Sequence, residues 1–194
     1  PCPDSPGVKF TCDASVTVPT NVRGLFSANH WLGRVDNGDG TATERWQRDR
    51  RYSAYLMGLL VGDYRYRGYD ERCGIFALPE MIDRAYTEFA SLPAIMAATE
   101  EVFRKKMPSG RFTPAVLPES FPYGGMEYPV LTFLSPLIVA GDGSKLEVVI
   151  HELVHDLLGN DVTNESWSDL WINEGFTVWA AQRVAERLYG VERA

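Results

Sequence analysis

Cysteine is scarce in this sequence of 194 residues, which contains only Cys2, Cys12 and Cys73. Their number is odd and their spacing matches no metal-binding motif, so they predict neither a disulfide framework nor a metal site. A reduced, cytoplasmic protein is therefore expected rather than a secreted one.

Long apolar runs are missing as well. The longest candidates, such as residues 56–61, are far shorter than the roughly 20 residues that span a membrane as a helix. The first residues do not resemble a signal peptide. Charged residues of both signs are spread along the chain and give a net charge of −7, which argues against nucleic acid as the main partner. We therefore expect neither a membrane nor a nucleic acid as a partner.

The first third of the chain has the pattern of antiparallel β-structure. Between residues 8 and 18, apolar side chains occupy every even position and polar ones every odd position, as a half-buried strand requires. The sequence NGDG at 37–40 predicts a turn between two further strands. A second β-rich stretch runs through residues 52–76.

The pattern changes near residue 78. Ile82, Ala85, Tyr86 and Phe89 recur at helical spacing, and Pro93 stands where a second helix can begin. Short strands are expected at 115–117 and 131–134, and helices from residue 144 to the end. The sequence therefore predicts an α+β protein, with a β-rich domain over residues 1–78 and a second domain over 79–194.

The strongest motif is HELVH at 151–155. Ser144 and Glu147 have the spacing of a capping box that opens a helix, and Gly159 followed by Asn160 predicts where it ends. His151 and His155 then lie on one face of that helix, so both imidazoles can reach one metal ion. Glu152 can present its carboxylate to the attacking water.

A catalytic zinc ion needs a third protein ligand, and Glu174 is the candidate, because 18 residues separate it from His155. That interval fits a connection and the first turn of an antiparallel helix. A structural zinc site is the alternative, but such sites commonly use four ligands rich in cysteine. Two of the three histidines lie in the motif, which favours catalytic zinc.

Two adjacent glycines, Gly124 and Gly125, precede Glu127 in the sequence FPYGGMEYP at 121–129. An open backbone of this kind lets a peptide pair with it directly, and the carboxylate of Glu127 can bind an α-amine. Without further information, the segment is equally well a turn with an acidic residue.

Three motifs in order resemble the gluzincin aminopeptidase family, in particular the branch that contains leukotriene-A(4) hydrolase and aminopeptidase B. They are GGME at 124–127, HELVH at 151–155 and WINEG at 171–175. Shorter stretches add to the likeness, namely residues 121–127, 131–133, 140–142, 159–160 and 162–164. The resemblance implies the end of a saddle-like antiparallel β-domain, followed by the first part of a thermolysin-like catalytic domain.

The resemblance also implies roles for single residues. Zinc is expected on His151, His155 and Glu174, with Glu152 as general base, and Glu127 is expected to bind the free N-terminus of a peptide substrate. The residues expected to line the substrate are Tyr123, Gly124, Gly125 and Met126. Tyr128 departs from the family, which more often carries asparagine at this position. The departure affects the details of amine recognition and the shape of the pocket, but not Glu127 itself.

The same resemblance implies a fragment, because the family's β-domain begins earlier and its catalytic domain continues beyond Ala194 to a tyrosine that stabilises the oxyanion. Loss of one oxyanion donor costs on the order of a hundred- to a thousand-fold in rate. We therefore expect residues 1–194 alone to bind zinc weakly or not at all and to be nearly inactive.

Three other functions remain open. A zinc endopeptidase would use the same ligands, but Glu127 disfavours internal peptide segments. Epoxide hydrolysis of a lipid would depend on pocket residues mostly outside this segment. A binding module that has lost catalysis would be expected to lack at least one ligand, whereas all three are present.

Overall fold

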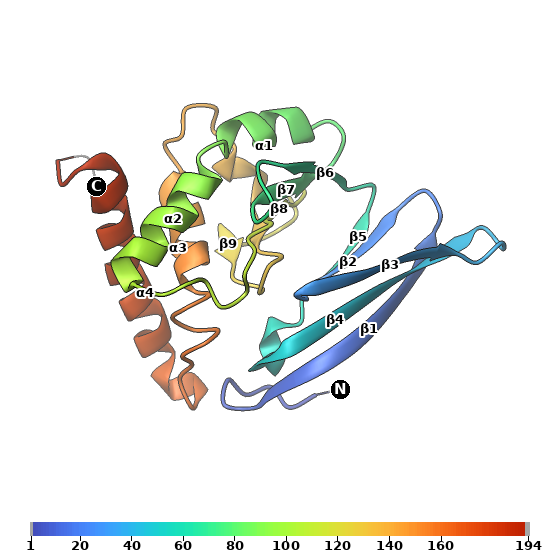
Figure 1. Ribbon diagram of the computed structural model, residues 1–194, viewed down its shortest axis with the longest axis horizontal. Helices are drawn as coiled ribbons and strands as arrows, with labels where there is room; N and C mark the ends of the chain where they lie inside the picture. The colour runs from blue at the N-terminus through green and yellow to red at the C-terminus, as the bar shows by residue number, and fades with distance from the viewer. Residues whose placement is uncertain (1, 193–194) are drawn as a thin grey trace.

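A computed structural model describes residues 2–192. The long β-strands lie on one side of the molecule and the four α-helices on the other (Figure 1). The α+β class predicted from the sequence is confirmed.

The N-terminal strands form a three-stranded antiparallel sheet in the order β1-β4-β3. Strand β1 (Lys9–Pro19) pairs along its length with β4 (Thr41–Ser53), and β4 pairs with β3 (His30–Asp36). The even-numbered side chains of β1 are half-buried or buried, whereas the odd-numbered ones from Thr11 onward are exposed. The turn at 37–40 joins β3 to β4, and both of its glycines have positive φ. The predicted strand and turn are confirmed.

A small two-stranded sheet lies beside the first one. Strand β2 (Arg23–Phe26) pairs antiparallel with β5 (Leu59–Gly62). The 3₁₀-helix η1 (Ala54–Leu56) connects β4 to this sheet. This turn brings Tyr55 into contact with Trp167, next to the helices where the candidate site lies.

The third sheet has five short strands in the order β6-β7-β8-β10-β9. Their bounds are β6 (Arg65–Gly68), β7 (Gly74–Ala77), β8 (Ala115–Val116), β9 (Gly125–Met126) and β10 (Phe133–Leu134). Strands β7, β8 and β10 are parallel, and β9 is an antiparallel edge strand. The sheet thus takes strands from both sides of residue 78, and the division into domains at that residue stays a prediction.

The helices bury one hydrophobic core against this sheet. They are α1 (Ile82–Glu88), α2 (Leu92–Phe103), α3 (Leu146–Val154) and α4 (Leu170–Tyr189), with 3₁₀-turns η2 (Pro136–Ile138) and η3 (Trp167–Asp169). Phe89, Ile95 and Leu153 in this core are fully buried. Pro93 stands in the first turn of α2, as predicted, and Gly190 is the C-cap residue of α4. None of the helices in residues 2–192 is long and apolar enough to cross a membrane.

Two predictions about α3 are wrong. Ser144 does not cap the helix, which starts one residue later than a cap at Ser144 requires, at Leu146, with Lys145 as N-cap and no side-chain cap bond. The backbone N–H of Ser144 instead donates to Asp142 Oδ1 in a local turn. The helix also ends at Val154 and not at Gly159, which lies beyond a further turn. His155 is the C-cap residue and keeps helical backbone angles, so its ring still lies one turn from His151.

Candidate metal and peptide site

Three potential metal ligands meet where α3 packs against α4. His151 and His155 come from α3 and its C-cap, and Glu174 comes from the second turn of α4. One ligand atom from each residue lies within 4.8 Å of the other two. His155 is buried and Glu174 is about half-exposed. One side of this group of ligands therefore packs against the core, and the other side faces solvent.

The spacing of these atoms fits a small tetrahedral cation. The two Nε2 atoms are 3.0 Å apart, and Glu174 Oε2 lies 3.4 Å from His151 Nε2 and 3.6 Å from His155 Nε2. Zinc bonds of about 2.0–2.1 Å in a tetrahedron place neighbouring ligand atoms about 3.3 Å apart. Two imidazole nitrogens this close repel through their lone pairs unless a proton or a cation lies between them. The donor set therefore fits zinc.

Groups behind His155 fix the orientation of its ring. Its Nδ1 lies 3.0 Å from the carbonyl oxygen of Leu158 and must donate to it, because a carbonyl only accepts. Thr177 of α4 lies 3.2 Å from the same nitrogen and donates to the same carbonyl. The proton on Nδ1 leaves Nε2 as the metal-binding atom, which is the usual arrangement around a ligating histidine.

The site concentrates carboxyl groups around the two histidines. Burial raises the pKa of the Glu152 carboxyl to about 8, and the carboxylates of Glu127 and Glu174 act in the same direction. Burial acts to lower the pKa of His155, but its hydrogen bond to Glu174 and the neighbouring carboxylates outweigh that effect and raise it to about 9. Hydrogen bonds from His151 and His155 hold the pKa of Glu174 far below its usual range. Such a cluster attracts a cation.

Glu152 is buried directly against the backbone of β9. A Cβ atom on Gly125 would lie 2.2 Å from Glu152 Oε1, so the carboxylate occupies the space that any other side chain at position 125 would need. A Cβ on Gly124 would meet only Val148 at 3.9 Å. The two adjacent glycines therefore differ: Gly125 is required by Glu152, and Gly124 leaves the surface open.

Glu127 lies just beyond the edge strand and is buried, with 8% of its surface exposed. Its Oε1 accepts a hydrogen bond of 3.2 Å from the hydroxyl of Tyr55. Asn160 donates a bond of 2.8 Å to its backbone carbonyl. The carboxylate is near enough to Glu152 and His155 to affect the pKa of both, so the structure brings it together with the three ligands.

A cavity of about 530 Å³ opens beside His151 and Glu152, and it is also lined by Gly124, Gly125 and side chains of α3 and α4. Glu127, His155 and Glu174 do not line it. Met126 and Tyr123, both expected at the substrate, do not line it. Met126 packs half-buried in the core, and Tyr123 is 65% exposed with its ring edge-on to Phe121.

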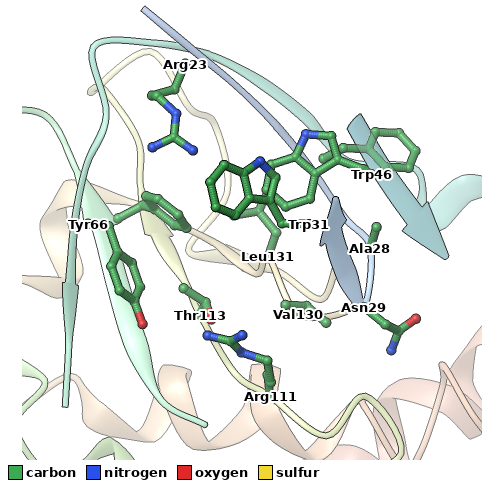
Figure 2. A pocket seen from close by; sticks show the side chains of 12 residues that line it. Arg23, Ala28, Asn29, Trp31, Trp46, Tyr66, Arg111, Thr113, Val130 and Leu131 are labelled. Carbon is green, nitrogen blue, oxygen red and sulfur yellow. The ribbon is translucent and has the colours of Figure 1, made fainter. Parts of the chain in front are cut away.

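A second cavity of about 260 Å³ lies between the two smaller sheets and the five-stranded sheet. Figure 2 shows Trp31 and Trp46 at its centre, with Arg23 and Arg111 on opposite sides. The charge of Arg23 is neutralised by a bidentate ion pair with the buried Glu44. The two cavities share no lining residue, so this one is separate from the metal ligands.

Several contributors to the site were not predicted from the sequence, namely Tyr55, Thr177 and the side chain of Asn160. Asn160 was noted only as part of a helix stop. Thr177 stands three positions after Glu174, on the helical spacing that points to the same face, which is a signal that could have identified it. Tyr55 offered no such signal.

The chain is similar in sequence to members of a known peptidase family. The peptidase family M1 domain matches residues 87–194, which is more than half of the chain. Leukotriene A-4 hydrolase of Xenopus laevis is 37% identical over 193 residues, covering 99% of this chain and 32% of that protein. Aminopeptidase B of Mus musculus is 37% identical over 190 residues, covering 98% of this chain and 28% of that protein.

The chain also resembles solved structures of leukotriene A4 (LTA4) hydrolase. The structure of yeast LTA4 hydrolase in complex with bestatin superimposes with a TM-score of 0.87 at 31% sequence identity, covering 96% of this chain and 28% of that one. The native yeast enzyme gives a TM-score of 0.86. The fold matches both the N-terminal and the catalytic regions of these structures.

The fold and the site together define a peptidase domain. More narrowly, the chain belongs to peptidase family M1, and its likeness to leukotriene A-4 hydrolase and aminopeptidase B confirms the branch expected from the sequence. The chain spans 28–32% of the length of these curated relatives.

Proposed function

We propose that the protein is a zinc-dependent aminopeptidase that removes the N-terminal residue of peptides. The observation that carries the proposal is the convergence of His151, His155 and Glu174 within 4.8 Å, beside the buried carboxylate of Glu152. The similarity to aminopeptidase B supports the same reading.

His151, His155 and Glu174 would hold the zinc ion. When bound, zinc supplies a Lewis acid that polarises the scissile carbonyl and makes water more acidic. Glu152 takes a proton from the attacking water and passes it to the departing amine. Its contact with the backbone of Gly125 fixes the carboxylate where it can do both.

The edge strand and Glu127 would position the substrate. Because β9 is at the edge of its sheet, an extended peptide can add to it as a further strand. Glu127 would bind the protonated α-amine of that peptide. An acidic group at this end of the strand limits the substrate to peptides with a free N-terminus, and cleavage then releases one residue.

The test is hydrolysis of leucine, alanine and arginine anilides by the full natural protein, with the zinc content measured in each sample. Wild type is compared with Glu127→Ala and Glu152→Ala. We expect both variants to keep zinc and to lose turnover by on the order of a hundredfold or more. Wild-type protein without zinc, or full activity in Glu152→Ala, would contradict the proposal.

The same assay separates an aminopeptidase from an endopeptidase. Cleavage of N-acetylated peptides by wild type, together with unchanged activity in Glu127→Ala, would favour the endopeptidase. The low, odd number of cysteines and their spacing favour a reducing, cytoplasmic location, which we propose as well.

A further inference from the structure

One residue of the β-rich part of the chain reaches the amine-binding carboxylate. The hydroxyl of Tyr55, in η1, donates a hydrogen bond of 3.2 Å to Glu127 Oε1. In the described part of the chain, the other carboxylate oxygen of Glu127 accepts no hydrogen bond. Tyr55 thus occupies one oxygen and leaves the second available to a ligand.

The backbone around Tyr55 is firmly held. The carbonyl of Leu56, the next residue, accepts bonds from Ser27 Oγ at 2.9 Å and from an Arg48 guanidinium nitrogen at 3.2 Å. Ser27, Arg48 and Leu56 are all fully buried. Hydrogen bonds between fully buried groups hold the 3₁₀-turn in place, so the backbone from which the Tyr55 side chain extends is well fixed.

The ring of Tyr55 is held as well. It packs edge-on against Trp167, with ring centroids 4.9 Å apart and planes at 64°. The indole of Trp167 in turn donates to the backbone of Asp4. The Tyr55 side chain therefore loses little rotational freedom when its hydroxyl binds a carboxylate, which is the condition for a preorganised contact.

Glu127 is fixed from the opposite side by the loop that follows α3. Asn160 Nδ2 donates to the Glu127 carbonyl at 2.8 Å, and the Asn160 N–H donates to the His155 carbonyl at 2.9 Å. Asn160 thus connects the backbone of Glu127 to a metal ligand, while Tyr55 sets the direction of the carboxylate. The position of the amine relative to the metal site then depends on both contacts.

The Tyr55 hydroxyl remains a donor at neutral pH. Burial raises its pKa far above the usual range, and the charge of Glu127 raises it further. A protonated phenol next to a carboxylate can only donate to it, so the direction of this hydrogen bond is fixed.

We propose that Tyr55 is a positioning residue for the amine-binding carboxylate, so that the β-rich part of the chain sets the selectivity for a free N-terminus. The inference rests on the proposed role of Glu127. In this proposal Tyr55 does not contact the scissile bond. Its effect should therefore appear in the binding of the amine and not in the chemical step.

The test compares Tyr55→Phe with wild type in the full natural protein loaded with zinc. The probes are L-leucine hydroxamate and its N-acetyl derivative, whose dissociation constants are measured by calorimetry, and leucine anilide for kinetics. Loss of one hydrogen bond to a charged group predicts about tenfold weaker binding of the free amine, with little change for the N-acetyl form. KM should rise by a similar factor while kcat changes by less than about twofold.

Tyr69→Phe is the matched control. It removes another half-buried phenol hydroxyl, which donates to the carbonyl of Tyr86 in α1, away from the site. This variant should leave both dissociation constants unchanged. An equal loss for the free amine and its N-acetyl form in Tyr55→Phe would indicate a merely structural role and overturn the inference.

A second variant separates this inference from the proposed function. In a Glu127→Ala background, Tyr55→Phe should have no further effect on amine binding, because its partner is gone. If Glu127→Ala keeps the preference for the free amine, the proposed anchor is wrong and the inference falls with it. If Glu127→Ala abolishes the preference but Tyr55→Phe leaves it intact, only the inference is wrong.

Discussion

Gly58 lies directly against the ring of Tyr128, so close that a Cβ atom on Gly58 would come within 2.7 Å of Tyr128 Cγ. The ring cannot easily move away, because it packs against Phe133 with centroids 4.7 Å apart. Tyr128 stands where the family resemblance led us to expect asparagine. Its partly buried ring packs against the core, and the absence of a side chain at Gly58 leaves room for it.

Gly58→Ala should therefore destabilise the protein by about 1–3 kcal/mol through overpacking. The double variant Gly58→Ala with Tyr128→Asn should lose less than the sum of the two single changes, since the second removes the ring that the new methyl group meets. Urea unfolding of the four proteins measures this coupling. Strictly additive losses would show that the two positions do not constrain each other.

Gly125→Ala should abolish hydrolysis while leaving zinc bound. The new methyl group would displace the Glu152 carboxylate, and a displacement of about 1 Å can cost on the order of a hundredfold in rate. Gly124→Ala is the comparison, because its methyl group meets only Val148 at ordinary distance and should cost much less. Anilide hydrolysis with parallel zinc analysis tests the difference, and equal losses in both variants would contradict it.

Thr177→Val should weaken zinc binding by roughly tenfold or more, because partners behind a ligating histidine tune its affinity for the metal. Thr99→Val is a matched control: Thr99 is also buried in a helix, and its hydroxyl bonds to the Ile95 carbonyl in α2. Competition with a chelator measures both affinities. A Thr177→Val protein that retains zinc as strongly as the Thr99→Val protein would refute the role.

Acid should remove the contribution of Glu100 to stability. The hydrogen bond from Arg72, together with those from Lys106 and the Met107 N–H, lowers the pKa of Glu100 to about 2. The folded state thus favours the charged form, so the stabilisation is complete above about pH 4.5 and is lost as the pH falls towards 2. Its size at neutral pH should be roughly 1–3 kcal/mol.

Unfolding free energies of wild type and Glu100→Gln, measured across this pH range, test the prediction. The difference between them should shrink as the solution becomes more acidic. Glu101→Gln serves as control, because the Glu101–Arg187 pair is exposed on both sides and contributes little. A difference for Glu100→Gln that stays constant with pH would show that its charge is not the source of the stability.

Local periodicity was sufficient for β1 and for the two histidines on one helix face, whereas Glu174 was inferred from its distance along the chain and from the family resemblance. Alternation in residues 8–18 predicted β1, and helical spacing brought His151 and His155 together. Each of these rests on neighbours within one strand or one turn of helix. At Ser144 the sequence is compatible with both a helix cap and a turn that begins at Asp142. The sequence alone did not show that the turn forms and that the helix starts after it.

Contacts between distant parts of the chain could not be predicted in the same way. Tyr55 lies in an apolar stretch, and its sequence context predicts an ordinary core residue. No neighbouring residue indicates that its hydroxyl will contact a carboxylate 72 positions later. The pairing of β7 with β8 across residue 78 likewise depends on how the whole chain packs. Contacts of this kind are determined by the tertiary structure, and a short segment of sequence does not reveal them.

The ammonium group of Lys9, at the start of β1, donates to the carbonyls of Asn160 and Asp161 at 3.0 and 2.8 Å. These partners are 151 and 152 positions away, so β1 emerges from the ribosome long before they are made. Strand β1 can pair with β4 as soon as residue 53 has been translated, but its contact with the loop that supports Glu127 and His155 must wait for residues 160 and 161. Assembly of the metal-binding end therefore follows formation of the N-terminal sheet during synthesis.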